Sequence, residues 1–197
     1  DNSFSVKLPT ENMIDYAKKM QGVADFLHCD IMNKNFVQKD TYDYNLVANI
    51  NRNSLIMLDV HLMVDEPSGD VPKYIEAGAN IVTVHYEAFE DKEELVDTIN
   101  FIKQNHTLAG LALKPATPFK NIRSFAYNCD VILVMGVEPG ASGQELIEAM
   151  FDKVKEIDNF RKENNLNFKI EFDGGVNPQN AQKLVDAGVD ILVSGSY

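Results

Sequence analysis

The chain has 197 residues with 45% apolar content, which is enough for one well-filled core and too little for two ordinary domains. Its formal net charge of −12 argues against nucleic acid as a partner, because phosphate backbones are bound by clustered Lys and Arg. No apolar run reaches the roughly 18 residues of a membrane helix, and the start DNSFSV lacks the profile of a secretory signal. We therefore expect a cytoplasmic protein with no membrane partner, in which Cys29 and Cys129 are reduced core thiols.

Short β-rich runs alternate along the chain with amphipathic stretches. The expected strands are 4–8, 24–31, 55–64, 80–87, 108–113, 130–137, 168–175 and 190–196. Helical spacing occupies 11–20, 91–105, 145–164 and 177–188, while residues 38–54 carry only a short helical pattern at 44–50. Near-continuous apolar strands that alternate with helices predict a parallel sheet with both faces covered.

Eight such units favour a closed α/β barrel of the (β/α)8 type, formed as a single domain over residues 1–197. The sequence stops at Tyr197, directly after the eighth expected strand. The helix that would complete the eighth unit is missing from this sequence, so we expect the chain to be truncated.

Polar side chains fall at the ends of several expected strands, where barrels of this type place their chemistry. His28 and Asp30 are two residues apart on one strand and therefore point to the same face. His61 ends the next strand and Asp173 ends the seventh. Two imidazoles and two carboxylates predict a site for one divalent metal ion, either Zn²⁺, Mn²⁺, Fe²⁺ or Co²⁺.

The two acids have a further consequence, because strands two and seven are three steps apart around an eight-stranded ring and lie nearly across it. Asp30 and Asp173 should therefore face each other. A planar substrate between opposed carboxylates can lose a proton to one and regain it from the other on the opposite face, which inverts a carbon centre. A metal would stabilise the negative charge of the intermediate enediolate.

Glycine-rich turns follow the last three expected strands: EPGASGQ at 138–144, DGGVNP at 173–178 and SGS at 194–196. Glycine lets backbone N–H groups approach an anion, so these turns favour phosphate binding. No GxxxxGK[ST] or GxGxxG pattern is present, which disfavours a nucleotide cofactor. Met32, Met63 and Met135 sit near strand ends, either as gap-filling core residues or as an apolar floor for a substrate.

The motifs HCDIMNKNFV, LDVHLMV, VTVHYEA, LALKPATP, VILVMGVEPGASGQ and IEFDGGVNPQNA resemble those of ribulose-phosphate 3-epimerases along nearly the whole chain. The resemblance implies a ribulose-phosphate-binding barrel, an isomerase of the pentose phosphate pathway that interconverts D-ribulose 5-phosphate and D-xylulose 5-phosphate, and a homo-oligomer. It implies Asp30 and Asp173 as proton carriers and His28, Asp30, His61 and Asp173 as metal ligands. The substrate contacts that it implies, together with the methionines above, are Ser5, Met32, His61, Met63, His85, Met135, Gly140, Ala141, Ser142, Gly143, Gly174, Gly175, Gly195 and Ser196.

The chain also departs from the family pattern. The usual Met-Asp-Gly is replaced by Met32, Asn33 and Lys34, which removes an acid beside the expected metal. The opening SFSVKLPTEN differs from the usual Ser-Ile-Leu-Ser-Ala-Asp start, and residues 38–54 differ from the usual loop after strand two.

Three alternatives follow from these departures. An allulose-6-phosphate 3-epimerase would share the metal site and mechanism. A related decarboxylase would carry an Asp-x-Lys arrangement on strand three, where this chain has DVHLMV. A catalytically inactive barrel that only binds a phosphosugar is the third, and the retained acids and histidines count against it.

Overall fold

Eight parallel strands close into one barrel in the computed structural model, which describes residues 2–9, 11–37, 39–41, 43–140 and 145–195. The strands follow one another around the ring in chain order, and β8 pairs with β1 to close it. They are β1 (Ser3–Lys7), β2 (Phe26–Met32), β3 (Met57–Met63), β4 (Ile81–His85), β5 (Leu108–Leu113), β6 (Val131–Met135), β7 (Lys169–Asp173) and β8 (Ile191–Ser194). The predicted (β/α)8 barrel is confirmed.

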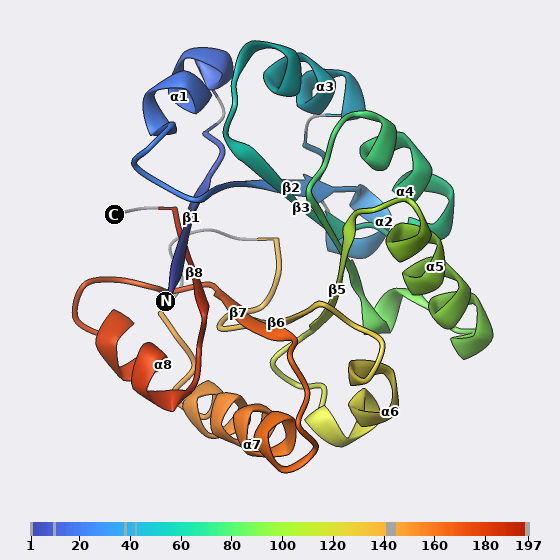
Figure 1. Cartoon of the computed structure of the whole chain (residues 1–197), viewed down its shortest axis with the longest axis vertical. Coiled ribbons are helices and arrows are strands. Elements are labelled where there is room, and N and C mark those ends of the chain that lie inside the picture. The colour runs from blue at the N-terminus through green and yellow to red at the C-terminus, as the bar shows by residue number, and fades with distance from the viewer. Residues whose placement is uncertain (1, 10, 38, 42, 141–144, 196–197) are drawn as a thin grey trace.

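The helices form a ring outside the strands (Figure 1). They are α1 (Met13–Met20), α2 (Lys34–Val37), α3 (Tyr44–Asn53), α4 (Pro67–Glu76), α5 (Lys92–Gln104), α6 (Arg123–Ala126), α7 (Met150–Glu163) and α8 (Ala181–Ala187), with 3-10 turns η1 (Tyr86–Ala88) and η2 (Phe119–Asn121). Local chemistry sets several starts: Asp43 accepts from the N–H groups of Asn45 and Leu46, and Asp91 accepts from that of Glu93. None of the helices in the described ranges is long and apolar enough to cross a membrane.

The weak helical pattern at 44–50 corresponds to a real helix, α3, whose capping Asp43 lies just before it. Two expected helices begin later than the pattern placed them: α8 begins at Ala181 rather than at residue 177, and α7 begins at Met150 rather than at residue 145. Residues 145–149 instead form an extended stretch and a turn, in which the Ile147 N–H donates to the carbonyl of Gly136 at 2.9 Å. That bond ties the segment to the end of β6.

The apolar core lies between the strands and the helices, and the inside of the barrel is unusually polar. Outward strand residues such as Leu27, Leu58 and Phe172 are fully buried against the helices. Both cysteines are buried and free, as predicted. The inward positions instead carry buried polar side chains: Ser5, His28, Asp59, His61, Thr83, His85, Glu171 and Asp173. Burying so many polar groups has a free-energy cost unless they are paired, which indicates a functional interior.

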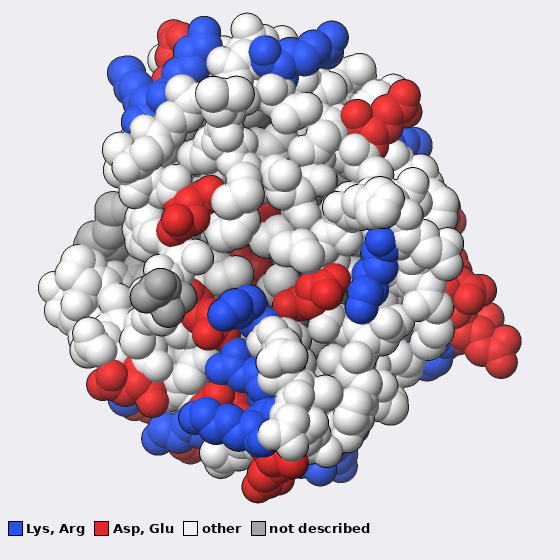
Figure 2. All heavy atoms as spheres, in the orientation of Figure 1, with Lys and Arg blue, Asp and Glu red and all other residues white. Residues whose placement is uncertain are grey.

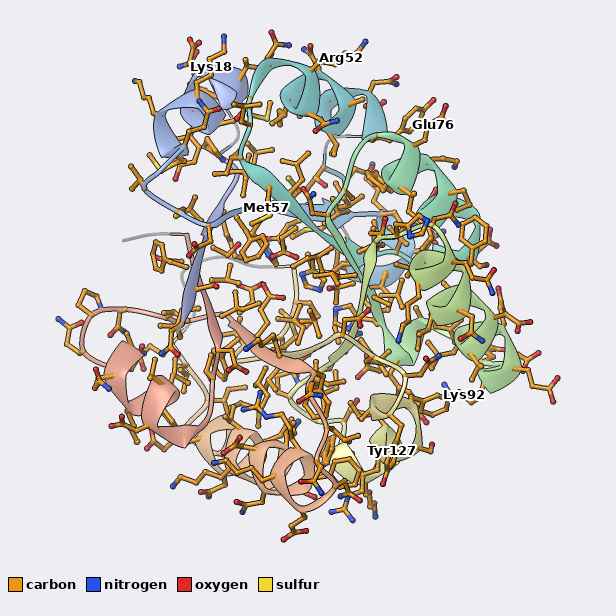
Figure 3. All side chains as sticks on the ribbon, in the orientation of Figure 1. Lys18, Arg52, Met57, Glu76, Lys92 and Tyr127 are labelled. Atoms are coloured by element: carbon orange, nitrogen blue, oxygen red, sulfur yellow. The ribbon has the colours of Figure 1, made fainter. Side chains whose placement is uncertain are left out.

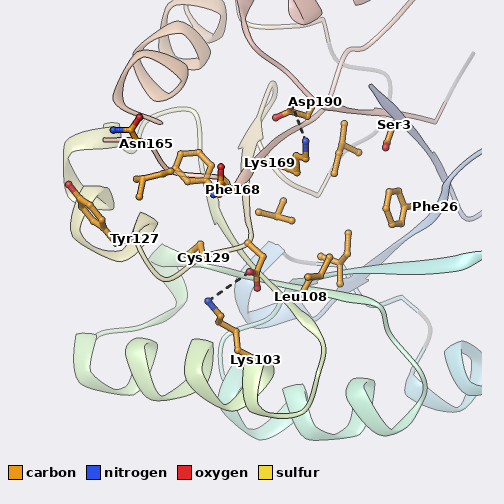
Figure 4. Close-up of a pocket in the computed structure, with 16 residues that line it drawn as sticks. Ser3, Phe26, Lys103, Leu108, Tyr127, Cys129, Asn165, Phe168, Lys169 and Asp190 are labelled. Atoms are coloured by element: carbon orange, nitrogen blue, oxygen red, sulfur yellow. Dashed lines mark ion pairs between the residues drawn. The ribbon is translucent and has the colours of Figure 1, made fainter. Parts of the chain in front are cut away.

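A pocket of about 580 Å³ opens at the end of the barrel where the strands begin. Figure 4 shows its lining, which includes Ser3, Phe26, Leu108 and Lys169. Barrels of this type carry their chemistry at the opposite end, where the strands finish. The polar interior described above extends toward that end, so we place the candidate site there.

Candidate active site

Four polar side chains meet at the end of the barrel where the strands finish, which is called the upper end below. His28 and Asp30 come from β2, His61 from β3 and Asp173 from β7, and one potential ligand atom of each lies within 4.8 Å of those of the others. The strand register explains the meeting, because Asp30 lies directly opposite His61 and His28 precedes Asp30 by two residues. Asp173 and both histidines are at most 1% exposed. The structure therefore brings together all four residues that the sequence singled out as metal ligands.

His28 is oriented by a carboxylate beneath the cluster. Its Nδ1 lies 2.5 Å from Oδ2 of Asp59, the inward residue of β3 two positions before His61. The other ring nitrogen, Nε2, is directed into the cluster, 3.2 Å from Asp30 and 3.7 Å from Asp173. Among the described residues it has no hydrogen-bond partner. A histidine with one nitrogen held and the other facing an acidic cluster has the arrangement of a metal ligand.

His61 is oriented by His85, which is in turn held by Glu87. Glu87 Oε2 lies 3.1 Å from His85 Nδ1, and His85 Nε2 lies 2.8 Å from His61 Nε2. Burial lowers the pKa of His85 to about 4, and the pKa of Glu87 is lowered to about 2 because His85, Thr117 and the Lys114 N–H outweigh the effect of its burial. His85 is therefore neutral and donates from Nδ1 to the Glu87 carboxylate.

The proton positions at His61 follow from that assignment. The unprotonated Nε2 of His85 accepts from His61 Nε2–H, so in the neutral imidazole that metal binding requires, His61 Nδ1 carries the lone pair. That nitrogen faces Oδ1 of Asp30 at a distance of 3.1 Å. Two lone pairs that face each other in a buried site call for a cation between them.

The ammonium of Lys7 also reaches the cluster, from β1. Its ammonium nitrogen lies 2.6 Å from Oδ2 of Asp30 and 2.9 Å from Asp173. Burial alone would lower the pKa of Lys7, but the charges of Asp173 and Asp30 outweigh burial and raise it, so Lys7 is protonated. Sequence reasoning missed this residue, although it lies two positions after Ser5 and so on the same inward face.

The charges in the cluster depend on one another. Burial by itself raises the pKa of Asp30, but Lys7 and His28 outweigh it and hold that pKa well below its usual range. Burial likewise lowers the pKa of His28, but the charges of Asp59 and Asp30 hold it well above its usual range. A metal-binding imidazole has to be neutral, so metal binding at this site would release a proton from His28.

The donor set suits a divalent transition metal. Two imidazole nitrogens and two carboxylates are ligands that zinc, iron, manganese or cobalt accept. Both imidazoles have their second nitrogen held by a partner. These residues fit the metal that the sequence predicts.

A second acidic layer lies directly beneath the cluster and was not predicted. Asp59 and Glu171 are fully buried, and they form with His28 a second group whose potential ligand atoms lie within 4.8 Å of one another. Burial and the charge of Asp59 raise the pKa of Glu171 well above its usual range, which favours the neutral acid. The sequence signal was available, because both residues sit two positions before a candidate ligand on the same strand.

The predicted substrate contacts have different placements. Ser5 is fully buried below the cluster, with its hydroxyl 3.4 Å from Asp59, so its direct contact with a substrate stays a prediction. His85 lies beside His61. Met32 and Met63 pair in register with each other, just beyond Asp30 and His61 on the same two strands. Met135 pairs in register with Asp173. Ala141, Ser142, Gly143 and Ser196 lie outside the described residues.

The glycines after β7 have a backbone that other residues would strain. Gly174 and Gly175 have φ values of 114° and 70°, and a Cβ on Gly175 would lie 2.6 Å from the Leu146 nitrogen. Gly140 and Gly195 also lie on the upper rim, after β6 and β8. The structure thus places exposed turns of three neighbouring strands on one side of the barrel mouth.

The short helix α2 lies over the other side of the mouth. The ring of Phe36 packs 5.1 Å from that of His85, and the Lys114 ammonium lies 4.2 Å above Phe36. Asn33, which replaces the usual acid, donates to Asp65 at 2.5 Å. Its side chain is therefore held by the loop after β3.

Comparison with known proteins decides the family. A model of the "Ribulose-phosphate 3 epimerase family" matches residues 8–197. The chain belongs to the ribulose-phosphate 3-epimerase family. It is therefore an isomerase with epimerase activity, as the sequence motifs indicated.

Curated relatives in this family span bacteria and plants. The chain is 35% identical over 177 residues to a ribulose-phosphate 3-epimerase of Aquifex aeolicus, covering 90% of this chain and 78% of that protein. It is 38% identical over 184 residues to one of Chlamydia pneumoniae, covering 92% and 79%. It is 40% identical over 173 residues to the chloroplastic enzyme of Arabidopsis thaliana, covering 88% and 61%.

Solved structures show how widely the fold is shared. A tryptophan synthase α-subunit mutant from Pyrococcus furiosus superposes with a TM-score of 0.75 at 11% identity, covering 100% of this chain and 88% of that one. A 3-hexulose-6-phosphate synthase gives 0.69 at 13%, covering 98% and 89%. At this identity the likeness shows the barrel alone, so the function of this family member is argued from its site.

Proposed function

We propose that this chain is a metal-dependent epimerase that inverts C3 of a ketose phosphate, interconverting D-ribulose 5-phosphate and D-xylulose 5-phosphate. The names of the curated relatives support ribulose phosphate as the substrate. His28, Asp30, His61 and Asp173 would hold one divalent ion. When bound, that ion would stabilise negative charge on the oxygens of the substrate.

One observation carries the proposal: Asp30 and Asp173, from strands three steps apart around the ring, converge on a single point. The Lys7 ammonium marks that point, since it lies within 2.9 Å of both carboxylates. A small planar group between the two aspartates would have one carboxylate on each face. This arrangement supports the proposed transfer of a proton from one face to the other.

The reaction follows as a two-step proton transfer. One carboxylate takes the C3 proton, and the electrons of the C–H bond form a C2–C3 double bond while the carbonyl oxygen gains negative charge. The resulting cis-enediolate is planar at C3. The opposite aspartate, which has to enter this step as the carboxylic acid, then gives its proton to the other face of C3, which restores the ketone with inverted configuration and leaves the two aspartates with exchanged protonation states.

The rim of the barrel would bind the phosphate and the carbon chain of the substrate. Gly140, Gly174, Gly175 and Gly195 lie in turns after β6, β7 and β8, and backbone N–H groups in such turns bind phosphate in barrels of this type. Met32, Met63 and Met135 would pack against the carbon chain and exclude water from the enediolate. Both assignments are part of the proposal.

The test is solvent exchange at C3. Metal-loaded protein is incubated with D-ribulose 5-phosphate in D₂O, and deuterium at C3 and formation of xylulose 5-phosphate are followed by NMR. Wild type should form deuterated xylulose 5-phosphate, and Asp173→Asn should lower the rate by at least about 100-fold, the usual contribution of a positioned general acid or base. Asp186→Asn, on the exposed face of α8, removes an equal charge away from the site and should keep the wild-type rate.

Absence of exchange in folded, metal-loaded protein would contradict the pentose assignment. The same assay with allulose 6-phosphate then tests the hexulose alternative. Absence of exchange with both sugars would leave an inactive phosphosugar-binding barrel as the answer.

A further inference from the structure

Lys7 has no role in the reaction described above, yet it makes short charged contacts with both candidate proton carriers. Its ammonium lies 2.6 Å from Asp30 Oδ2 and 2.9 Å from Asp173, both of which are candidate metal ligands. Within the described ranges, no other lysine or arginine forms an ion pair with either aspartate. The segment that carries Lys7 departs from the family pattern, and the family match begins only at residue 8.

The strand geometry directs this side chain into the site. Lys7 pairs in register with His28 of β2, and it follows the inward Ser5 by two residues. Its side chain is 29% exposed, so the charge lies at the barrel mouth, where solvent still reaches. The stem passes Gly195 of the β8 turn, where an added Cβ would lie 3.0 Å from Cδ of Lys7.

The charge of Lys7 competes with that of a metal. The carboxylates of Asp30 and Asp173, which would neutralise a divalent ion, already contact the Lys7 ammonium. On Asp30 the ammonium contacts Oδ2, whereas Oδ1 faces His61. An ion bound through Asp30 and Asp173 would lie next to the ammonium, and the two cations would repel each other at close range. A lysine has a flexible stem of four carbons, which allows the ammonium to withdraw into solvent past Gly195.

We propose that Lys7 is a tethered cation that joins the two aspartates in the metal-free protein and has to be displaced when a divalent ion binds, so that it weakens metal binding. The inference rests on the metal centre of the proposed function. It gives Lys7 two effects of opposite sign. The ammonium stabilises the metal-free barrel by separating two buried carboxylates, and it lowers the affinity of the loaded state.

The experiment is a metal titration without substrate. Chelator-treated protein is titrated with Zn²⁺ and with Mn²⁺ by calorimetry, in wild type, Lys7→Met and Lys7→Arg. Lys7→Met should bind each metal at least about tenfold more tightly, because one repelling charge is removed at close range. Lys7→Arg keeps the charge and should stay within about threefold of wild type. Lys18→Met is the matched control, since it removes the same charge from the outer helix α1 (Figure 3), and its affinity should be unchanged.

Thermal unfolding supplies the second measurement. Chelated Lys7→Met should melt below chelated wild type, and saturating metal should raise its melting temperature by more than it raises that of wild type. Lys7→Gln, which is neutral but polar, keeps the test available if Lys7→Met does not fold without metal, and it should also bind metal more tightly than wild type.

Several results would overturn the inference. It fails if the neutral variants bind metal no more tightly than wild type, or if Lys7→Arg gains affinity to the same extent, which would make shape rather than charge the cause. It also fails, together with the metal centre, if no variant binds metal. Epimerisation is measured separately, so an active wild type whose metal affinity does not respond to Lys7 overturns this inference alone.

Discussion

Individual side chains in this barrel are oriented by neighbours that do not themselves face the candidate metal position. Asp59 holds His28, and Glu87 acts on His61 through His85. Each partner fixes which ring nitrogen carries a proton, and therefore which nitrogen offers a lone pair to the site. The same partners explain why so many polar groups are buried inside the barrel, since most of them pair with one another.

Glu87 offers a test of this orientation. Glu87→Gln replaces the carboxylate that accepts from His85 with an amide, which can accept or donate and so no longer fixes the tautomer of His85. We expect metal affinity to fall by about 10-fold to 100-fold, the usual effect of losing such a partner. Calorimetric titration measures the affinity, and nitrogen chemical shifts of His61 report its tautomer. Glu90→Gln, exposed three residues later, is the control and should change neither quantity.

Among the elements, α7 is attached to the sheet by a partly buried ion network. Arg161 donates to Asp158 on the same helix, to Asp190 before β8 and to the carbonyl of Phe168. Asp158 also accepts from Lys162 at 2.6 Å. Burial by itself raises the pKa of Asp158, but its hydrogen bonds with Lys162 and Arg161 outweigh burial and lower it.

The sign of the pH dependence follows from that shift. A carboxyl whose pKa is lowered by folding contributes stability above its unfolded pKa of about 4, and the contribution is lost as the pH falls through the folded value. Asp158→Asn should therefore lower the free energy of unfolding by about 2 kcal/mol at neutral pH and by progressively less below about pH 4. Urea unfolding at several pH values measures the difference. Asp152→Asn on the same helix, where the Asp152 side chain is 88% exposed, should have little effect at any pH, and an equal loss there would argue against the network.

At the scale of the whole molecule, the barrel interior is filled in layers, and the sizes of residues that lie opposite each other on neighbouring strands are matched. Gly110 of β5 lies opposite Thr83 of β4, and a Cβ on Gly110 would lie 2.1 Å from the Thr83 hydroxyl. The small residue is therefore required by its neighbour rather than by the turn chemistry that usually favours glycine. Outside the barrel, the face drawn in Figure 2 shows acidic and basic side chains interspersed.

The tight fit between Gly110 and Thr83 predicts that substitutions at the two positions compensate each other. Gly110→Ala should destabilise the protein by about 1–3 kcal/mol, because the methyl group overpacks the interior. Thr83→Gly in the same chain should recover much of the loss, since it removes the side chain that the methyl group meets. Thermal unfolding of the two single variants and the double variant gives the coupling, and strictly additive losses would contradict a direct contact.

The sequence by itself determined the barrel, because alternation of apolar strands with amphipathic helices leaves few other arrangements. It also indicated His28, Asp30, His61 and Asp173, since residues that end parallel strands meet at one edge. The start of α7 was wrong because helical periodicity continues through 145–149, whereas the backbone there bonds to the end of β6.

Only the tertiary structure decided what lies between and beneath these residues. Lys7, Asp59, Glu87 and Glu171 are spread over β1, β3, η1 and β7. A spacing of two residues places Lys7, Asp59 and Glu171 on the inward faces of their strands, but their contacts with the cluster are set by the tertiary structure. Closure of the ring places β1 next to β8 and brings the Lys7 ammonium between two aspartates that are 143 residues apart along the chain, at Asp30 and Asp173. Such contacts depend on register and barrel closure, which are properties of the whole sheet rather than of any segment.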